Sequence, residues 1–282
     1  MITLGQSAAI RGFAGDPLPV VWDNLAQLGT RFRRGQLALV AAGPGTGKSA
    51  FVLSYALRSR VSCIYFSADS DAYTQLARSL AITGNLTMDE AETLARSGNA
   101  DRVAEIVQDV PIRFSYNPTP NLKHIQDQVL AYEEVYGDYP ELIVVDNALD
   151  VQLSGSENEL SQALDTLMAW LHDLARTTEA CVIVLHHVTG GYNDATTPIP
   201  LSGVKGQIGR VPELILTLHK SPDPYGVSDD LNVSTVKNRG QRADPSGQTF
   251  AELTFDGSRM LITDKDFTYQ SPIEENNDPW SN

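Results

Sequence analysis

The chain has 282 residues, enough for one large α/β domain or two small ones. Hydrophobic residues make up 42% of it, yet no apolar run approaches the roughly 18 residues of a membrane span. Residues 1–6 lack the basic start and apolar stretch of a signal peptide. The cysteines Cys63 and Cys181 have no metal-ligand spacing, and we expect them to be reduced core thiols of a cytoplasmic protein. Composition thus argues against a membrane protein, a disulfide framework and a zinc site.

The formal net charge is −14, whereas surfaces that bind nucleic acid are usually basic. Charge alone leaves the partner open, because a ring-shaped assembly can keep basic loops in its channel while its rim is acidic. Part of the excess negative charge is concentrated at the C-terminal end, since residues 273–282 carry three carboxylates and no basic side chain. We expect residues 267–282 to form an acidic, disordered tail, in which Trp280 is a candidate docking anchor.

In chain order, residues 1–20 are rich in Gly, Ala and Pro and are expected to form an arm or linker. A short helix and turn over Trp22–Arg34 leads into an apolar strand at Leu37–Ala41. The next eight residues follow the pattern GxxxxGK[ST], with alanine at the first glycine position (Ala42–Ser49). A helical pattern over Ala50–Ser59 comes directly after them. Strand, loop and helix together predict a phosphate-binding loop.

The chemistry of such a loop is phosphate recognition. Backbone N–H groups of small residues surround the α- and β-phosphates, and the following helix adds the positive end of its dipole. Lys48 would reach the β- and γ-phosphates, and Ser49 would ligate Mg²⁺. The sequence therefore predicts that ATP and Mg²⁺ are bound by Gly43, Pro44, Gly45, Thr46, Gly47, Lys48 and Ser49.

A polar turn at 68–71 follows the second expected strand, Cys63–Ser67. Hydrolysis of ATP needs a carboxylate that orients the attacking water, and this turn should lie beside the γ-phosphate. Asp69 and Asp71 are both candidates, and either could instead cap the helix that follows. We favour Asp69 as the catalytic carboxylate, with Asp71 as the alternative.

The rest of the chain alternates helices with strands and then ends in strands. Helices are expected at 72–81, 88–108, 121–136 and 160–175, and strands at 112–114, 142–146, 181–185, 214–218, 233–237, 249–255 and 260–263. A tight hairpin turn is expected at Asp256-Gly257. This order predicts an α/β fold over residues 21–266, with a doubly wound, mostly parallel sheet and an antiparallel extension at its C-terminal end.

Polar side chains follow two of the buried strands. Asp146 ends one strand, where it would hold Mg²⁺ through water, although a carboxylate there can also cap the next turn. His186 and His187 end the other, and because side chains alternate along a strand, one of them should face the phosphates. The glycine-rich loops beyond carry Lys205 and Arg210, which could grip a partner or belong to an ordinary surface loop.

Three cations close a late strand, in the segment 237–242. They could reach the γ-phosphate bound to a neighbouring subunit, as an arginine finger does. They could equally be solvent-exposed side chains of an ordinary surface turn.

Together these residues resemble the hexameric replicative helicases of the DnaB type, within the RecA-like ATPase superfamily. The resemblance covers residues 20–265 and rests on the segments 34–37, 65–69, 142–146, 186–187 and 236–239. The last segment reads K-x-R in that family and supplies a lysine and an arginine that act in trans. The resemblance implies these roles for Lys237 and Arg239. It further implies a phosphate sensor at His187 and DNA-gripping loops near 190–210, with Lys205 and Arg210.

The chain departs from the family pattern at three points. The family usually has glutamate where this chain has Asp69, so the carboxylate is one methylene shorter. The family's helical N-terminal domain is missing, as in the compact forms that phages and plasmids encode. The cationic segment also carries an insertion at 241–244.

The resemblance implies a homo-oligomeric, hexameric Mg²⁺-ATPase that moves on single-stranded or forked DNA during replication, in the host cytoplasm if phage-encoded. One alternative is a RecA-like recombination or loading ATPase that uses ATP as a switch. Another is a fork-specific nuclease with metal on Asp69, Asp71 and Asp146. A third is an ATP-dependent scaffold whose acidic tail recruits replication proteins.

Overall fold

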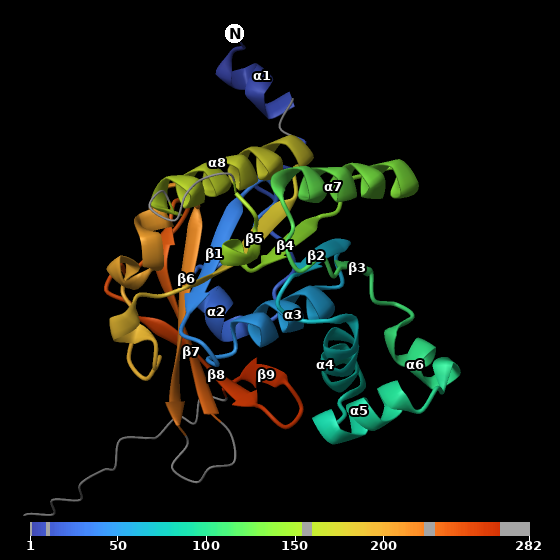
Figure 1. The fold of residues 1–282 in the computed structure, drawn as a ribbon. Coiled ribbons are helices and arrows are strands. Elements are labelled where there is room, and N and C mark those ends of the chain that lie inside the picture. Colours follow the sequence, from blue (N-terminus) through green and yellow to red (C-terminus); the bar gives the residue numbers. More distant parts are fainter. Residues whose placement is uncertain (1, 10–11, 154–159, 223–228, 266–282) are drawn as a thin grey trace, which may run out of the picture.

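The computed structural model describes residues 2–9, 12–153, 160–222 and 229–265. Within these ranges, nine strands form one sheet in the order β3-β2-β4-β5-β1-β6-β7-β8-β9 (Figure 1). The strands from β3 to β6 in that order are parallel, and β7, β8 and β9 add to β6 in antiparallel fashion. The predicted doubly wound sheet with an antiparallel extension is confirmed. The predicted acidic tail lies outside the described residues.

The strands have the following bounds: β1 Leu37–Ala42, β2 Cys63–Ser67, β3 Ile112–Ser115, β4 Leu142–Asp146, β5 Cys181–His187, β6 Leu214–Pro222, β7 Asp229–Asn238, β8 Phe250–Asp256 and β9 Leu261–Asp264. The four central strands β2, β4, β5 and β1 consist almost entirely of buried residues. Such continuous apolar runs are typical of parallel strands that are covered by helices on both faces.

Helices cover both faces of the sheet (Figure 1). Their bounds are α1 Leu4–Ala9, α2 Asp23–Gln27, α3 Lys48–Ser59, α4 Ala72–Gly84, α5 Met88–Arg96, α6 Ala100–Val107, α7 Leu122–Tyr136 and α8 Leu160–Thr178. The buried side chains of α2 and α3 pack in one apolar cluster, and those of α7 and α8 pack in a second cluster on the other face. None of the helices in the described ranges is long and apolar enough to cross a membrane.

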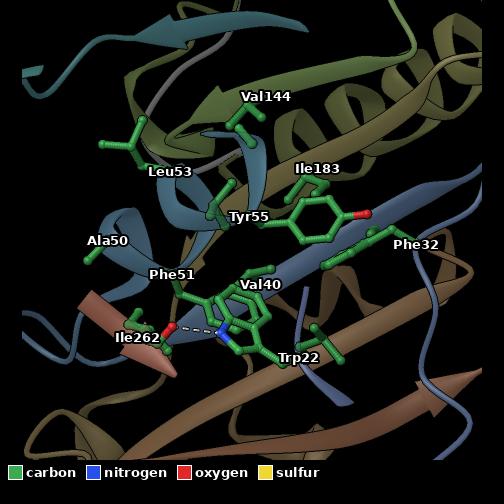
Figure 2. Close-up of a cluster of buried hydrophobic side chains, with 14 of the residues drawn as sticks. Trp22, Phe32, Val40, Ala50, Phe51, Leu53, Tyr55, Val144, Ile183 and Ile262 are labelled. Atoms are coloured by element: carbon green, nitrogen blue, oxygen red, sulfur yellow. Dashed lines mark hydrogen bonds between the residues drawn. The ribbon is translucent and has the colours of Figure 1, made fainter. Parts of the chain in front are cut away.

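The core on the α3 face ties the start of the domain to its last strand (Figure 2). Trp22 stacks on Phe51 of α3 with ring centroids 4.5 Å apart, and its indole N–H donates to the carbonyl of Ile262 in β9 at 2.9 Å. Such an aromatic pair contributes about 0.5–1.5 kcal/mol beyond its buried area. Upstream, Leu18 is buried and its N–H donates to the Phe32 carbonyl. The chain is thus packed on the body before β1 begins.

The structure differs from the predicted elements in three places. The helix predicted at 88–108 is two helices, because Gly98 adopts a φ of 69° and Asn99 caps α6 through the Arg102 N–H. β6 runs on to Pro222 and β7 begins at Asp229, so both of these paired strands are longer than predicted. The hairpin turn predicted at Asp256-Gly257 is a longer connection, 257–260, between β8 and β9.

Candidate nucleotide site

The GxxxxGK[ST] segment forms the turn between β1 and α3. Gly45 and Gly47 have φ values of 72° and 108°, which L-residues with a side chain rarely adopt. A Cβ atom at Gly43 would lie 2.2 Å from the backbone oxygen of Asn193, so no larger residue fits there. The glycines therefore let the backbone curl and let a second loop approach it. This is the geometry that a phosphate cradle requires.

Lys48 lies at the start of α3 and is buried. Its ammonium donates to the carbonyls of Ala42 and Gly43 at 3.3 and 3.2 Å, and the Thr46 hydroxyl also donates to Gly43. Burial lowers the pKa of Lys48, while the nearby charges of Asp146 and Asp69 oppose that shift. The lysine is thus held at the loop by contacts that a bound phosphate could replace.

Asp146 ends β4 beside this loop and is 5% exposed. Burial raises the pKa of its carboxyl, and hydrogen bonds from the hydroxyls of Ser49 and Tyr65 oppose the shift. A carboxylate and a hydroxyl are hard oxygen donors of the kind that Mg²⁺ prefers. Ser49 and Asp146, the predicted metal residues, therefore lie together and fit this ion.

The two candidate catalytic carboxylates differ in their surroundings. Asp71 accepts a hydrogen bond from the Thr74 N–H at 2.8 Å, caps α4, and has its pKa lowered by that contact. Asp69 is exposed in the same turn, near enough to Lys48 and Asp146 to shift the pKa of both. The geometry leaves Asp69 free to face a nucleotide, and its catalytic role stays a prediction.

The two histidines at the end of β5 lie on opposite faces of the sheet. His187 pairs with Ala42 and is half-buried, and burial together with the charge of Lys48 lowers its pKa. His186 is fully buried, and its Nε2 lies 3.0 Å from the Lys205 carbonyl oxygen. Burial lowers the pKa of His186 to about 4. Only His187 is therefore placed beside the phosphate loop.

Lys237 and Arg239 lie at the other end of the sheet. β1 runs toward the phosphate loop from Ala38, which is level with Leu214, whereas β7 is antiparallel and ends with Asn238 level with Leu214. The two cations are therefore separated from the loop of their own chain by most of the length of β1. We call this end the cation end, and the end with Lys48 and Asp146 the phosphate end.

The side chains at the cation end bind backbone oxygens of their own chain. Lys237 Nζ donates to the carbonyls of Gly209 and Arg210 at 2.6 and 2.9 Å, and Arg239 donates to the Arg210 carbonyl at 2.9 Å. Glu213 lies 3.7 Å from Arg239 and also accepts the Leu37 N–H. Both cations are thus close to the segment that precedes β6.

That segment contains the predicted DNA-contacting residues. After β5 the chain forms three short 3₁₀ turns, η3 Gly190–Tyr192, η4 Leu201–Gly203 and η5 Lys205–Arg210. Lys205 and Arg210 are both exposed, and Arg210 makes one surface ion pair with Asp165 at 3.4 Å. The structure brings these two cations into a single turn.

Sequence reasoning missed Tyr65 and Glu213. Strand alternation places Tyr65 on the same face of β2 as Ser67, but the pairing of Ser67 with Asp146 is seen only in the structure. Glu213 has no signal in the sequence, since its partners Leu37, His172 and Arg239 come from three distant segments.

The strand order and the loop at the carboxyl end of β1 define a RecA-like phosphate-loop ATPase fold. A family model described as the DnaB-like helicase C terminal domain matches residues 18–240. The chain belongs to this family, and membership implies hydrolysis of nucleoside triphosphates.

Two phage proteins are similar over nearly their whole length. The Gene 65 protein of Mycobacterium phage L5 is 56% identical over 266 residues, which cover 94% of this chain and 99% of that protein. The Gene 65 protein of Mycobacterium phage D29 is 51% identical over 232 residues, which cover 82% of this chain and 100% of that protein.

Solved structures show the same fold at low identity. One of them, a solved ATPase domain, has a TM-score of 0.76 and 14% identity, over 93% of this chain and 96% of that one. A DnaB-like replicative helicase, whose structure also concerns its interactions with primase, has a TM-score of 0.76 and 12% identity. That match covers 94% of this chain and 68% of the other.

Proposed function

We propose that the chain is an ATP-dependent helicase or translocase that acts on single-stranded or forked DNA in replication, as a homo-oligomeric ring of six copies. ATP would bind at the seam between two copies. The phosphate end of one copy supplies Lys48 and the pair Ser49 and Asp146, which would hold Mg²⁺. The cation end of the next copy supplies Lys237 and Arg239. Bound there, the ion neutralises charge on the phosphates.

The observation that carries this proposal is the separation of the two ends. Lys237 pairs with Ile215 near the start of β6, and the Arg239 N–H donates to the Glu213 carbonyl just before that strand, while the phosphate loop follows the end of β1. A side chain of Arg239 cannot span the strands between them. The cations can therefore complete only a nucleotide site that belongs to another copy, and a site shared in this way makes hydrolysis depend on assembly.

Within one copy, the chain connects the nucleotide to the turn η5. Asp69 would orient the attacking water, and His187 would contact the γ-phosphate. His186, next to it, holds the Lys205 carbonyl, so a shift at the end of β5 is passed to the first residue of η5. Lys237 and Arg239 hold the last residue of that turn. The exposed cations Lys205 and Arg210 would thus respond to two nucleotides, the one bound to their own copy and the one at the seam with the next copy.

The test is unwinding of a forked DNA duplex by the purified chain with ATP and Mg²⁺. We expect strand separation that requires ATP hydrolysis and a single-stranded tail on the fork. DNA binding without separation would support the alternative of a loading or recombination ATPase instead. Shortened strands on a denaturing gel would support the nuclease.

The structure argues against the nuclease alternative. Asp71, one of its three carboxylates, is engaged as the cap of α4. The scaffold alternative depends on a partner of the acidic tail, whose residues lie outside the described ranges.

A further inference from the structure

Tyr65 makes a buried contact with Asp146. Its ring lies inside the sheet–helix core on the α3 face, with 0% of its surface exposed. Its hydroxyl donates to Oδ2 of Asp146 at 2.9 Å. β2 and β4 are neighbouring parallel strands with Tyr65 level with Val144, so the phenol reaches along β4 to its last side chain.

The position of the hydroxyl is set by packing rather than by the carboxylate. The Tyr65 ring lies 5.4 Å from the ring of Phe114 in β3 and is enclosed by the core. A tyrosine has only two side-chain torsions, so a packed ring fixes its oxygen. Tyr65 can therefore orient the carboxylate of Asp146, whereas Tyr65 does not need Asp146 to hold its own position.

Ser49 is the other hydroxyl that reaches Asp146. Ser49 is itself a candidate metal ligand, so its hydrogen bond to the carboxylate competes with that role. The hydrogen bond from Tyr65 does not compete, because a buried phenol in the core is not a candidate ligand. It takes one lone pair of Oδ2 and leaves the other lone pairs of the carboxylate for a hydrated ion.

We propose that Tyr65 is a positioning residue of the nucleotide site, which orients Asp146 toward the metal through this hydrogen bond. The proposal rests on the proposed function, in which Asp146 serves Mg²⁺. Partners that orient metal-binding side chains typically contribute about 10–100-fold to metal affinity. Tyr65 should act in the same range, at its lower end, because Asp146 binds the ion through water.

The experiment compares Tyr65→Phe with Tyr55→Phe. Tyr55 is a matched control, since it is also buried on the α3 face and its hydroxyl donates to a backbone oxygen, that of Pro19, at 3.1 Å. Binding of Mn²⁺, as an EPR-visible substitute for Mg²⁺, is measured with each full-length variant in the presence of a non-hydrolysable ATP analogue. Thermal unfolding of the same samples reports their stability.

We expect Tyr65→Phe to weaken Mn²⁺ binding about 10-fold, and to raise the Mg²⁺ concentration for half-maximal ATPase activity by a similar factor. Tyr55→Phe should change stability alone. 4-Aminophenylalanine at position 65, which keeps a donor at the same place, should recover most of the Mn²⁺ affinity even if Tyr65→Phe is poorly folded.

Unchanged Mn²⁺ affinity in Tyr65→Phe, an equal loss in Tyr55→Phe, or no recovery with the amino analogue would overturn the proposal. Asp146→Asn separates this failure from failure of the proposed function. If Asp146→Asn also leaves Mn²⁺ binding intact, the metal site itself is misplaced. If Asp146→Asn abolishes binding and Tyr65→Phe does not alter it, only the role of Tyr65 is wrong.

Discussion

The phosphate end and the cation end of the sheet are built in different ways. At the phosphate end, Lys48 and Asp146 are buried and bonded to neighbouring strands or to their own loop. At the cation end, Arg239 is about half exposed, and its contacts are one carbonyl and a loose ion pair with Glu213. The first arrangement is held by the fold of one chain, whereas the second can be rearranged by a partner. The two ends should therefore respond differently to mutation, acid and assembly.

The largest expected effect separates binding from catalysis. Arg239→Ala should lower kcat of the ATPase on the order of 10³-fold, because an arginine finger acts on the transition state, while nucleotide binding stays intact. Lys48→Ala should lose nucleotide binding as well. Titration of a fluorescent ATP analogue, alongside steady-state ATPase rates, distinguishes the two.

Arg242→Ala is the matched control at the cation end, since Arg242 is an exposed cation three residues along. It should retain hydrolysis. Equal losses in Arg239→Ala and Arg242→Ala would show that local charge, and not a specific contact, is what matters there.

The second prediction concerns the two carboxylates that follow β2. Asp69→Asn should lower kcat by about 10²–10⁴-fold, because the water loses its base, with little change in stability. Asp71→Asn should keep hydrolysis, and Asp71→Ala should lower the stability because the helix cap is lost. ATPase rates and chemical denaturation of the three variants check this. A reversed pattern would assign catalysis to Asp71.

The third prediction uses acid to compare the ends. Burial places the folded-state pKa of His186 at about 4, below the ordinary value of 6.5, so the unfolded chain binds a proton first. Protonation of His186 therefore does not lower the free energy of unfolding above pH 6.5. As the pH falls from 6.5 toward 4, the free energy of unfolding decreases. The loss reaches about 3 kcal/mol at most.

His186→Gln should flatten this decline, as measured by urea denaturation at several pH values. His172→Gln, at the cation end beside Glu213, is the control. Identical pH profiles for wild type and His186→Gln would show that the buried imidazole is not what makes the phosphate end acid-sensitive.

The smallest expected effect is on DNA binding. Arg210→Ala removes an exposed cation whose ion pair with Asp165 contributes little, so stability should change by less than about 0.5 kcal/mol. Affinity for single-stranded DNA should fall several-fold. The slope of log affinity against log salt should become less steep, by the equivalent of about one phosphate contact. Fluorescence anisotropy across a salt series measures both. An unchanged slope would remove Arg210 from the DNA interface.

Sequence reasoning could predict the phosphate end well for a physical reason. Its residues are contiguous, as in the loop before α3, or they end apolar strands, as Asp146 and His187 do, and the ends of parallel strands meet. Tyr65 escaped notice because its role depends on which strand lies next to β2. The same holds for Glu213, whose partners are distant in sequence. Gly98 followed by Asn99 is a sequence signal for a helix break. The prediction of one helix over 88–108 gave more weight to the helical pattern on both sides of it.

The central claim is that each nucleotide site is shared by two copies, and mixing two inactive variants tests it most directly. Lys48→Ala lacks a working phosphate end and Arg239→Ala lacks a working cation end. In a mixed assembly, the loop of an Arg239→Ala copy meets the intact Arg239 of a Lys48→Ala copy. We predict that ATPase activity, lowered on the order of 10³-fold or more in either variant alone, rises on mixing and depends on total protein concentration. A mixture that stays as slow as the separate variants, or an Arg239→Ala protein that hydrolyses ATP at the wild-type rate, would contradict the shared site.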